Sequence, residues 1–150
     1  MIIRSARISD VEAIHHLILQ LAEYEKAPEK VVSTPEVLST ALFQSHPWVF
    51  AWVAETSSQE IVGTAICYLR YSTWNGPVLY LEDLIVDQTF RRKNIGTLLM
   101  HEIIGFAKLN SYRHITWQVL DWNSSAIDFY KKFDVNLDSS WVNVILPIEK

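Results

Sequence analysis

The chain has 150 residues, the usual length of one domain, and 49% of them are hydrophobic, which excludes an intrinsically disordered chain. Its 17 acidic and 13 basic residues give a formal net charge of -4, which argues against a nucleic-acid partner because such a surface would be basic. The single cysteine, Cys67, excludes an internal disulfide and a multi-cysteine metal site, and we expect it to be a small core residue.

The first part of the chain predicts a strand followed by two helices. A short strand is expected at 2–7, and Ser9 begins the Ser-x-x-Glu pattern of a capping box. Apolar residues repeat at helical spacing over 14–21, which predicts a helix that ends near Tyr24. After a polar loop, a threonine–proline pair at 34–35 is typical of the start of a second helix.

The rest of the chain predicts a mixed sheet. Three strand-like runs, at 48–55, 61–71 and 78–86, are separated by loops short enough to favour an antiparallel meander. A turn, a helix (97–109), a strand (114–119), a helix (about 124–132) and a last strand (141–148) follow. The passage from 78 to 119 predicts a right-handed parallel crossover. We therefore expect one mixed α/β domain over 1–150. No apolar run approaches the roughly 20 residues that cross a bilayer, so we expect a cytoplasmic protein with no membrane partner.

The segment "TFRRKNIG" (89–96) concentrates positive charge at the expected start of a helix. Arg91, Arg92 and Lys93 are unfavourable for the helix itself at this end, whereas a bound anion would offset them and would also accept the open N–H groups. Gly96 lets backbone approach a ligand, and Asn94 tolerates a positive φ. The residues alone leave a second interpretation open, a solvated turn whose arginines pair with surface carboxylates.

The stretch "EDLIVDQTFRRKNIGTLLM" resembles the central motif of the GNAT superfamily of N-acetyltransferases. Within it, "LAEYEK", "HPW", "LYLEDLIV" and "WNSSAIDFYKK" are similar to the spermidine/spermine (diamine) and thialysine acetyltransferases. The likeness covers about residues 2 to 132; Asn94 and Asp134 stand where the family usually has glycine. It implies a GNAT-like mixed sheet of about six to seven strands, antiparallel in its N-terminal part and flanked by about four helices. It also implies acetyl-CoA as acetyl donor and a homodimer. Independently of the resemblance, the five histidines show no metal-binding spacing, so we expect no metal.

The resemblance further implies which residues contact acetyl-CoA. The backbone of Leu84, Ile85 and Val86 would pair with the pantetheine arm. The turn that begins at Arg91 and contains Arg92, Lys93, Asn94, Ile95, Gly96 and Thr97 would cradle the pyrophosphate. The start of the next-to-last element, Asn123, Ser124, Ser125 and Ala126, would contact coenzyme A, and from the residues alone Asn123 is a good N-cap.

Two residues are candidates for proton transfer. Glu82 and Asp83 interrupt an apolar strand, and strict alternation would point one carboxylate to each face. Such a carboxylate is costly unless it is paired, for example with Arg70, lies at a solvent-facing edge, or is functional. The resemblance favours Glu82 as the catalytic residue that binds and deprotonates the amine. Tyr130 beside Phe129 would alone suggest packing, but it matches the family's general acid.

The resemblance also implies residues that line the amine, and these are Tyr24, Glu25, Glu82, Thr116, Trp117 and Gln118. We expect a small cationic amine substrate, polyamine- or diamine-like, acetylated by direct attack. Thialysine-like amino acids, other diamines and a protein amine remain alternatives; an arginine facing a substrate carboxylate would favour amino acids. A non-catalytic acyl-CoA-binding domain and a nucleotide-binding domain are alternatives of a different class.

Overall fold

The computed structural model describes residues 1–148, and the chain divides into two compact units, Met1–Trp117 and Gln118–Lys150. The first unit contains a five-stranded sheet in the order β1-β2-β3-β4-β5. The strands are β1 (Ile2–Ser5), β2 (Val49–Glu55), β3 (Ile61–Ser72), β4 (Gly76–Val86) and β5 (Ile115–Thr116). The first four are antiparallel neighbours, and β5 is parallel to β4, as the crossover predicted.

Three helices belong to the first unit and one to the second. They are α1 (Val11–Tyr24), α2 (Pro35–Phe43), α3 (Ile95–Leu109) and, in the second unit, α4 (Ser124–Tyr130). Short 3-10 turns lie at Ile8–Asp10, Pro28–Lys30, Gln88–Phe90 and Lys131–Phe133. The helix predicted to start after Thr34 is confirmed, because the Thr34 hydroxyl accepts the Val37 N–H at 3.4 Å.

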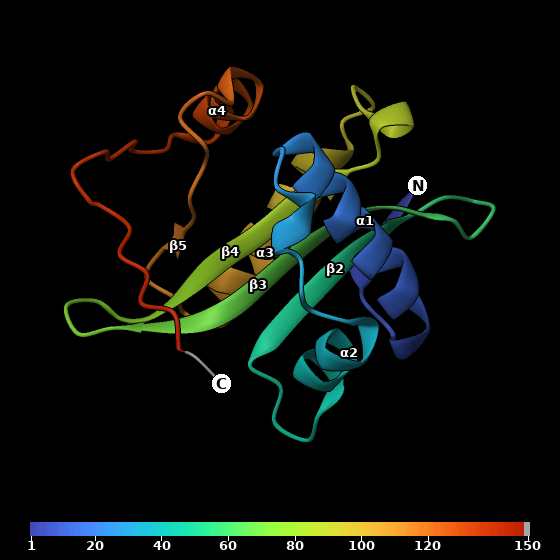
Figure 1. The fold of residues 1–150 in the computed structure, drawn as a ribbon, viewed down its shortest axis with the longest axis horizontal. Helices are drawn as coiled ribbons and strands as arrows, with labels where there is room; N and C mark the ends of the chain where they lie inside the picture. Colours follow the sequence, from blue (N-terminus) through green and yellow to red (C-terminus); the bar gives the residue numbers. More distant parts are fainter. Residues whose placement is uncertain (149–150) are drawn as a thin grey trace. The chain divides into compact units, whose positions relative to one another are not determined.

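The helices of the first unit cover opposite faces of its sheet (Figure 1). Helices α1 and α2 pack on one face, where Ile14, Leu42, Val53 and Ile66 belong to one buried cluster. Helix α3 covers the other face, where Phe106 makes an edge contact with Trp52 at 4.9 Å between ring centroids. Successive side chains of β2 point to opposite faces of the sheet, so that neighbouring residues pack against different helix layers. Cys67 is fully buried, as expected, and burial raises the pKa of its thiol to about 12.

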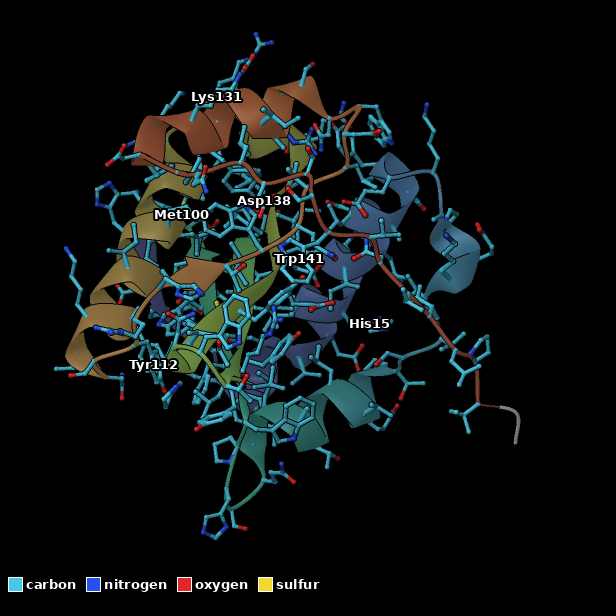
Figure 2. The ribbon with its side chains drawn as sticks, turned by 90° about the vertical axis from the view of Figure 1, so that its left-hand side faces the viewer. His15, Met100, Tyr112, Lys131, Asp138 and Trp141 are labelled. Carbon is cyan, nitrogen blue, oxygen red and sulfur yellow. The ribbon has the colours of Figure 1, made fainter. Side chains whose placement is uncertain are left out.

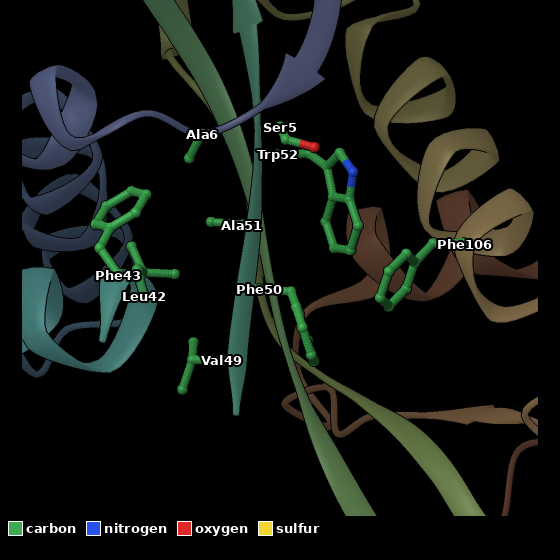
Figure 3. Close-up of a pocket in the computed structure, with 9 residues that line it drawn as sticks. All are labelled: Ser5, Ala6, Leu42, Phe43, Val49, Phe50, Ala51, Trp52 and Phe106. Carbon is green, nitrogen blue, oxygen red and sulfur yellow. The ribbon is translucent and has the colours of Figure 1, made fainter. Parts of the chain in front are cut away.

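A cavity of about 170 Å³ near β2 belongs to this packing (Figure 3). Ala51 and Leu42 lie on one side of the strand, and Phe50 and Phe106 lie on the other. Its lining carries no ionisable side chain. The cavity therefore offers no side chain for proton transfer.

Several sequence predictions are corrected. Within residues 1–148 the sheet has five strands rather than six to seven, because 141–148 forms no strand and the predicted strand at 114–119 is reduced to Ile115–Thr116. The Ser9 capping box is wrong: Ser9 lies inside the 3-10 turn, and the Asp10 carboxylate instead accepts the Arg7 N–H at 2.7 Å. This bond closes the 3-10 turn that precedes the helix, so that α1 itself begins only at Val11.

The second unit is mostly irregular apart from α4. The Asn123 side chain accepts the Ala126 N–H at 3.2 Å, which confirms the predicted N-cap. Gln118 donates a hydrogen bond to the Asn143 side chain. Figure 2 labels Trp141 in the C-terminal segment, whose large apolar side chains are 78 to 90% exposed. These side chains are Trp141, Val142, Val144, Ile145, Leu146 and Ile148.

Candidate active site

The start of α3 leaves its first N–H groups open. Asn94 is its N-cap, has φ of 63° in the left-handed region as predicted, and makes no side-chain cap. The first helical hydrogen bond runs from Leu98 N–H to Asn94 carbonyl at 3.1 Å, so the N–H groups of Asn94, Ile95, Gly96 and Thr97 precede it. Arg92, with φ of 62°, is also left-handed, a conformation that costs energy for a residue with a side chain. This backbone is suited to hold a phosphate.

Three cations, Arg91, Arg92 and Lys93, immediately precede this helix start in the chain. The Arg91 guanidinium lies 4.9 Å from the Tyr24 ring centroid and donates from Nε to the Val86 carbonyl at 3.2 Å. Lys93 Nζ lies 4.5 Å from the Phe90 ring centroid. None of the three forms an ion pair with a carboxylate of the described residues 1–148. The second interpretation was a solvated turn whose arginines pair with surface carboxylates. Within the described residues no such pair is formed.

Strand β4 carries a bulge at Glu82. Asp83 lies opposite Ile66, but Leu81 lies opposite the next residue, Cys67, so Glu82 has no partner on β3. A bulge bends a strand and redirects its side chains, and bulges occur frequently beside active sites. The expected strict alternation between Glu82 and Asp83 therefore fails at this point.

Both carboxylates lie on the face of the sheet that α1 and α2 cover farther along the strands. Asp83 is in register with Ile66, a member of the cluster under those helices. Tyr68 and Tyr80 pair on the same face, two residues along β3 from Ile66, and the Glu82 charge helps raise the pKa of both phenols after desolvation. The bulge thus brings Glu82 and Asp83 to one face.

Asp83 has the most perturbed carboxyl of this cluster. Burial, then the charges of Glu82 and Glu25, raises the pKa of Asp83 from 3.8 to about 7. Burial also raises the pKa of Glu25, which follows the last turn of α1. Among the described residues no hydrogen bond or ion pair is formed by the Asp83 or Glu82 side chain. Sequence reasoning gave Asp83 no role, although a second carboxylate in an apolar strand was a signal.

Aromatic rings lie next to these carboxylates. Tyr68 stacks on Tyr80 with ring centroids 4.9 Å apart, and Trp48 meets Tyr68 edge-on at 6.3 Å. Arg70 lies over the Tyr80 ring, with Cζ 5.9 Å from its centroid. The possible pairing of Arg70 with a strand carboxylate is absent among the described residues, since no ion pair there contains it.

The predicted donor and substrate segments divide between the two units. Residues 84–86 pair with β3 on one side, whereas β5 pairs with β4 only at Leu79 and Tyr80. In the described sheet, their second edge is therefore not paired with a strand. Thr116 lies opposite Tyr80, beside the tyrosine pair. Trp117 ends the first unit, while Gln118, the residues 123–126 and Tyr130 belong to the second.

In the second unit, Tyr130 is the last residue of α4. Its ring meets that of Phe129 edge-on, with centroids 5.3 Å apart. Ser124 and Ser125 are exposed in the first turn of the helix. The packing expected from sequence alone is therefore present, and the role of its phenol stays a prediction.

Residues 1–148 contain no group of three or more His, Cys, Asp or Glu side chains arranged to hold a metal ion. No helix in that part of the chain has both the length and the apolar character that a membrane crossing needs.

Comparisons with known proteins agree with this architecture. The acetyltransferase (GNAT) family model matches residues 14–134. A thialysine N-epsilon-acetyltransferase of Bos taurus is 35% identical over 138 residues, which cover 87% of this chain and 81% of the relative. The spermidine/spermine N(1)-acetyltransferase-like protein 1 of Homo sapiens is 28% identical over 93% of this chain and 21% of its own length.

A crystal structure of a mutant protein from Bacillus halodurans shows the same fold. Its TM-score is 0.82 at 24% identity, over 98% of this chain and 100% of the other. This structural likeness shows the fold alone, whereas the family match and the bovine relative identify the protein family. The chain belongs to the acetyltransferase (GNAT) family, near the thialysine and spermidine/spermine acetyltransferases, and is an N-acetyltransferase.

Proposed function

We propose that this enzyme transfers an acetyl group from acetyl-CoA to a primary amine of a small cationic substrate by direct attack. GNAT acetyltransferases use acetyl-CoA as the acyl donor. The observation that carries the proposal is the order along one stretch of chain: a bulge with two carboxylates on one face, an unpaired strand edge, and then an uncapped helix start among cations.

The α3 start fits the pyrophosphate of coenzyme A. Its four N–H groups precede the first helical bond, and no described carboxylate neutralises Arg91, Arg92 or Lys93. Helix dipole, N–H groups and full positive charges all favour an anion there. We assign the pyrophosphate to residues 91–97, the pantetheine arm to the backbone of 84–86, and further coenzyme A contacts to 123–126.

The carboxylates fit the amine. An amine with a pKa near 10.4 must lose a proton before it can attack, which costs roughly 4–5 kcal/mol at pH 7. In our proposal Glu82 binds the ammonium and accepts its proton, directly or through water. Asp83, whose pKa of about 7 suits proton transfer near neutral pH, is the adjacent second carboxylate. Tyr24, Glu25, Thr116, Trp117 and Gln118 would line the substrate.

Tyr130 is proposed to give a proton to the departing sulfur. Its phenol is a weaker acid than a thiol, so a strong hydrogen bond or partial transfer is sufficient. The Tyr130→Phe variant keeps the ring that packs on Phe129 and removes only the hydroxyl. We expect lower turnover with little change in the dissociation constant for coenzyme A, measured by calorimetry. Turnover equal to wild type would refute this role.

The proposed activity is tested by thiol release from acetyl-CoA with polyamines, thialysine, lysine and peptides. Glu82→Gln should lower kcat by roughly 100-fold or more, since general bases contribute factors of that size. Glu60→Gln, at an exposed position before β3, is the matched control and should change nothing. Tight coenzyme A binding without thiol release for any amine would instead support a non-catalytic acyl-CoA-binding domain.

We also propose a homodimer in the cytoplasm, with no nucleic-acid partner. The six exposed apolar side chains within 141–148 support an interface, because monomeric proteins rarely expose so many together. Light scattering measures the mass in solution. A monomer at micromolar concentration would contradict the proposal, and Ile145→Asp should shift a dimer toward monomer.

A further inference from the structure

We infer that Gln20 is a positioning residue, which holds the end of α1 against the turn that precedes α3 and thereby couples the binding of coenzyme A to the binding of the amine. The inference rests on the proposed function, because it concerns how the donor and acceptor parts of that site affect each other. Gln20 itself is not among the residues that we assign to coenzyme A or to the amine.

Two side chains of a polar stripe on α1 contact the chain between β4 and α3. His16, Gln20 and Tyr24 are spaced four residues apart, so they lie on one face of the helix. Gln20 Nε2 donates to the Asp87 carboxylate at 3.0 Å and lies 3.3 Å from His16 Nε2. One helical turn farther along, the Arg91 guanidinium lies 4.9 Å from the Tyr24 ring centroid. The helix therefore contacts this segment on both sides of its 3-10 turn.

Asp87 gives Gln20 a fixed partner. Its backbone N–H donates to the Val62 carbonyl at 2.9 Å, which joins it to β3. One carboxylate oxygen accepts the Thr89 N–H at 2.9 Å and the Thr89 hydroxyl at 2.6 Å, and the other accepts from Gln20. The hydrogen bond from Thr89, then that from Gln20, lowers the pKa of Asp87, so this carboxylate is charged at neutral pH. A charged acceptor strengthens the bond from the Gln20 amide.

Arg91 contacts the acceptor side although it belongs to the donor turn. Its Nε donates to the Val86 carbonyl at 3.2 Å, and its guanidinium lies over the Tyr24 ring. A planar guanidinium can stack through its face while its edge donates to phosphate oxygens. Tyr24 ends α1 and is followed by Glu25, and we assign both residues to the amine. Tyr24 and Arg91 therefore connect the two ligand sites, and the Gln20 bond supports this contact from one helical turn away.

Contacts of this kind couple two binding events without a large movement. A bound pyrophosphate would restrict the turn at 91–97, and the contacts of Asp87 and Arg91 would then also restrict the end of α1. An amine that binds there afterwards loses less conformational entropy, so its affinity is higher. By linkage, the amine must raise the affinity for coenzyme A by the same factor, and we expect this coupling factor to be about 5 or more in wild type.

The test measures the coupling factor by calorimetry. Spermidine and thialysine are titrated in separate experiments with and without saturating coenzyme A, which carries no acetyl group and so permits no turnover. Gln20→Glu places a second carboxylate against Asp87 and should reduce the factor to less than about 2, because like charges repel. Gln20→Leu removes the hydrogen bond without adding charge and should act in the same direction. Coenzyme A affinity without amine should change little in either variant.

Steady-state kinetics give a second measurement of the same effect. At saturating acetyl-CoA, the KM for the amine should rise in Gln20→Glu by about the factor that is lost, while kcat changes little. This division is expected because the variant weakens binding of the second ligand and leaves the reacting groups in place.

A rescue variant separates positioning from a general loss of packing. Asp87→Asn combined with Gln20→Glu again makes an amide face a carboxylate, with donor and acceptor exchanged, and should recover most of the coupling factor. The asparagine side chain also keeps an oxygen that can accept from Thr89. Gln44→Glu makes the same chemical change at the exposed end of α2 and should leave the factor as in wild type.

Hydrogen exchange tests the coupling without any amine. Coenzyme A should slow exchange at 91–97 and also at 24–31 in wild type, but only at 91–97 in Gln20→Glu. Equal protection of 24–31 in the two proteins, a coupling factor of one in wild type, or no recovery in the double variant would overturn the inference. Coenzyme A that fails to bind, or an absence of thiol release with every amine, would refute the proposed function instead.

Discussion

Asp10 and Asp83 are aspartates of the same unit that are withdrawn from solvent, but their surroundings move their pKa values in opposite directions. Asp10 accepts hydrogen bonds from Arg4 at 2.6 and 3.0 Å and from the Arg7 N–H, and the bond from Arg4 lowers its pKa most. The pKa of Asp83 is raised by burial and by neighbouring negative charges. One region satisfies its charges internally, and the other does not.

The starts of α2 and α3 differ in the same way. In α2 the Thr34 hydroxyl caps the helix, Pro35 occupies the first position, and Glu36 adds a favourable negative charge. In α3, Asn94 makes no cap and cations precede the first turn. The comparison teaches that groups serving the fold are satisfied within the chain, whereas those we assign to ligands are left open.

The largest effect on stability should come from removing the ion pair between Arg4 and Asp10. We expect Asp10→Asn to lower the free energy of unfolding by about 3–5 kcal/mol, because it removes one partner of a buried ion pair. Urea denaturation measures this. Asp128→Asn, which breaks the exposed pair with Lys131, is the control and should cost no more than about 1 kcal/mol. Equal losses of unfolding free energy in the two variants would contradict the structural role that we assign to the Arg4–Asp10 pair.

The next effect tests the open helix start. Thr97→Glu places a carboxylate at the third position of α3, where it suits the helix but repels a phosphate. We expect coenzyme A affinity to fall by about 100-fold or more, with thermal stability unchanged or slightly higher. Calorimetry and thermal melts measure the two quantities.

Val37→Glu makes the same change at the third position of α2, on a side chain that is 59% exposed. It should stabilise that helix slightly and leave coenzyme A binding unchanged. A loss of coenzyme A affinity in this control, or none in Thr97→Glu, would contradict the assignment of the anion site to α3.

The smallest effect concerns pH. Since the folded pKa of Asp83 is raised from 3.8 to about 7, its contribution favours the fold at low pH and is lost as pH rises through about 7. Wild type should therefore lose stability relative to Asp83→Asn between pH 5 and 8, on the order of 1 kcal/mol after solvent screening. Urea denaturation at each pH measures the difference. A constant difference would show that Asp83 does not titrate in this range.

Local patterns in the sequence were sufficient for most elements of the first unit. Helical spacing predicted α1 and α3, the threonine–proline start predicted α2, and short loops predicted the antiparallel order of β2, β3 and β4. The left-handed Asn94 was also predictable, because its cause is local side-chain geometry. The segment 141–148 was not: its apolar pattern resembles a strand, but a strand requires a paired partner, and none is formed in the described residues.

Residues close together in the chain were sufficient to indicate the family, the helix start rich in cations, and the pair of carboxylates in an apolar strand. Three other features are visible only in the folded chain: the bulge at Glu82, the pKa of about 7 at Asp83, and the position of Arg70 over the Tyr80 ring. Those features depend on the register between β3 and β4 and on burial by other elements. Neither is encoded in any single stretch of sequence.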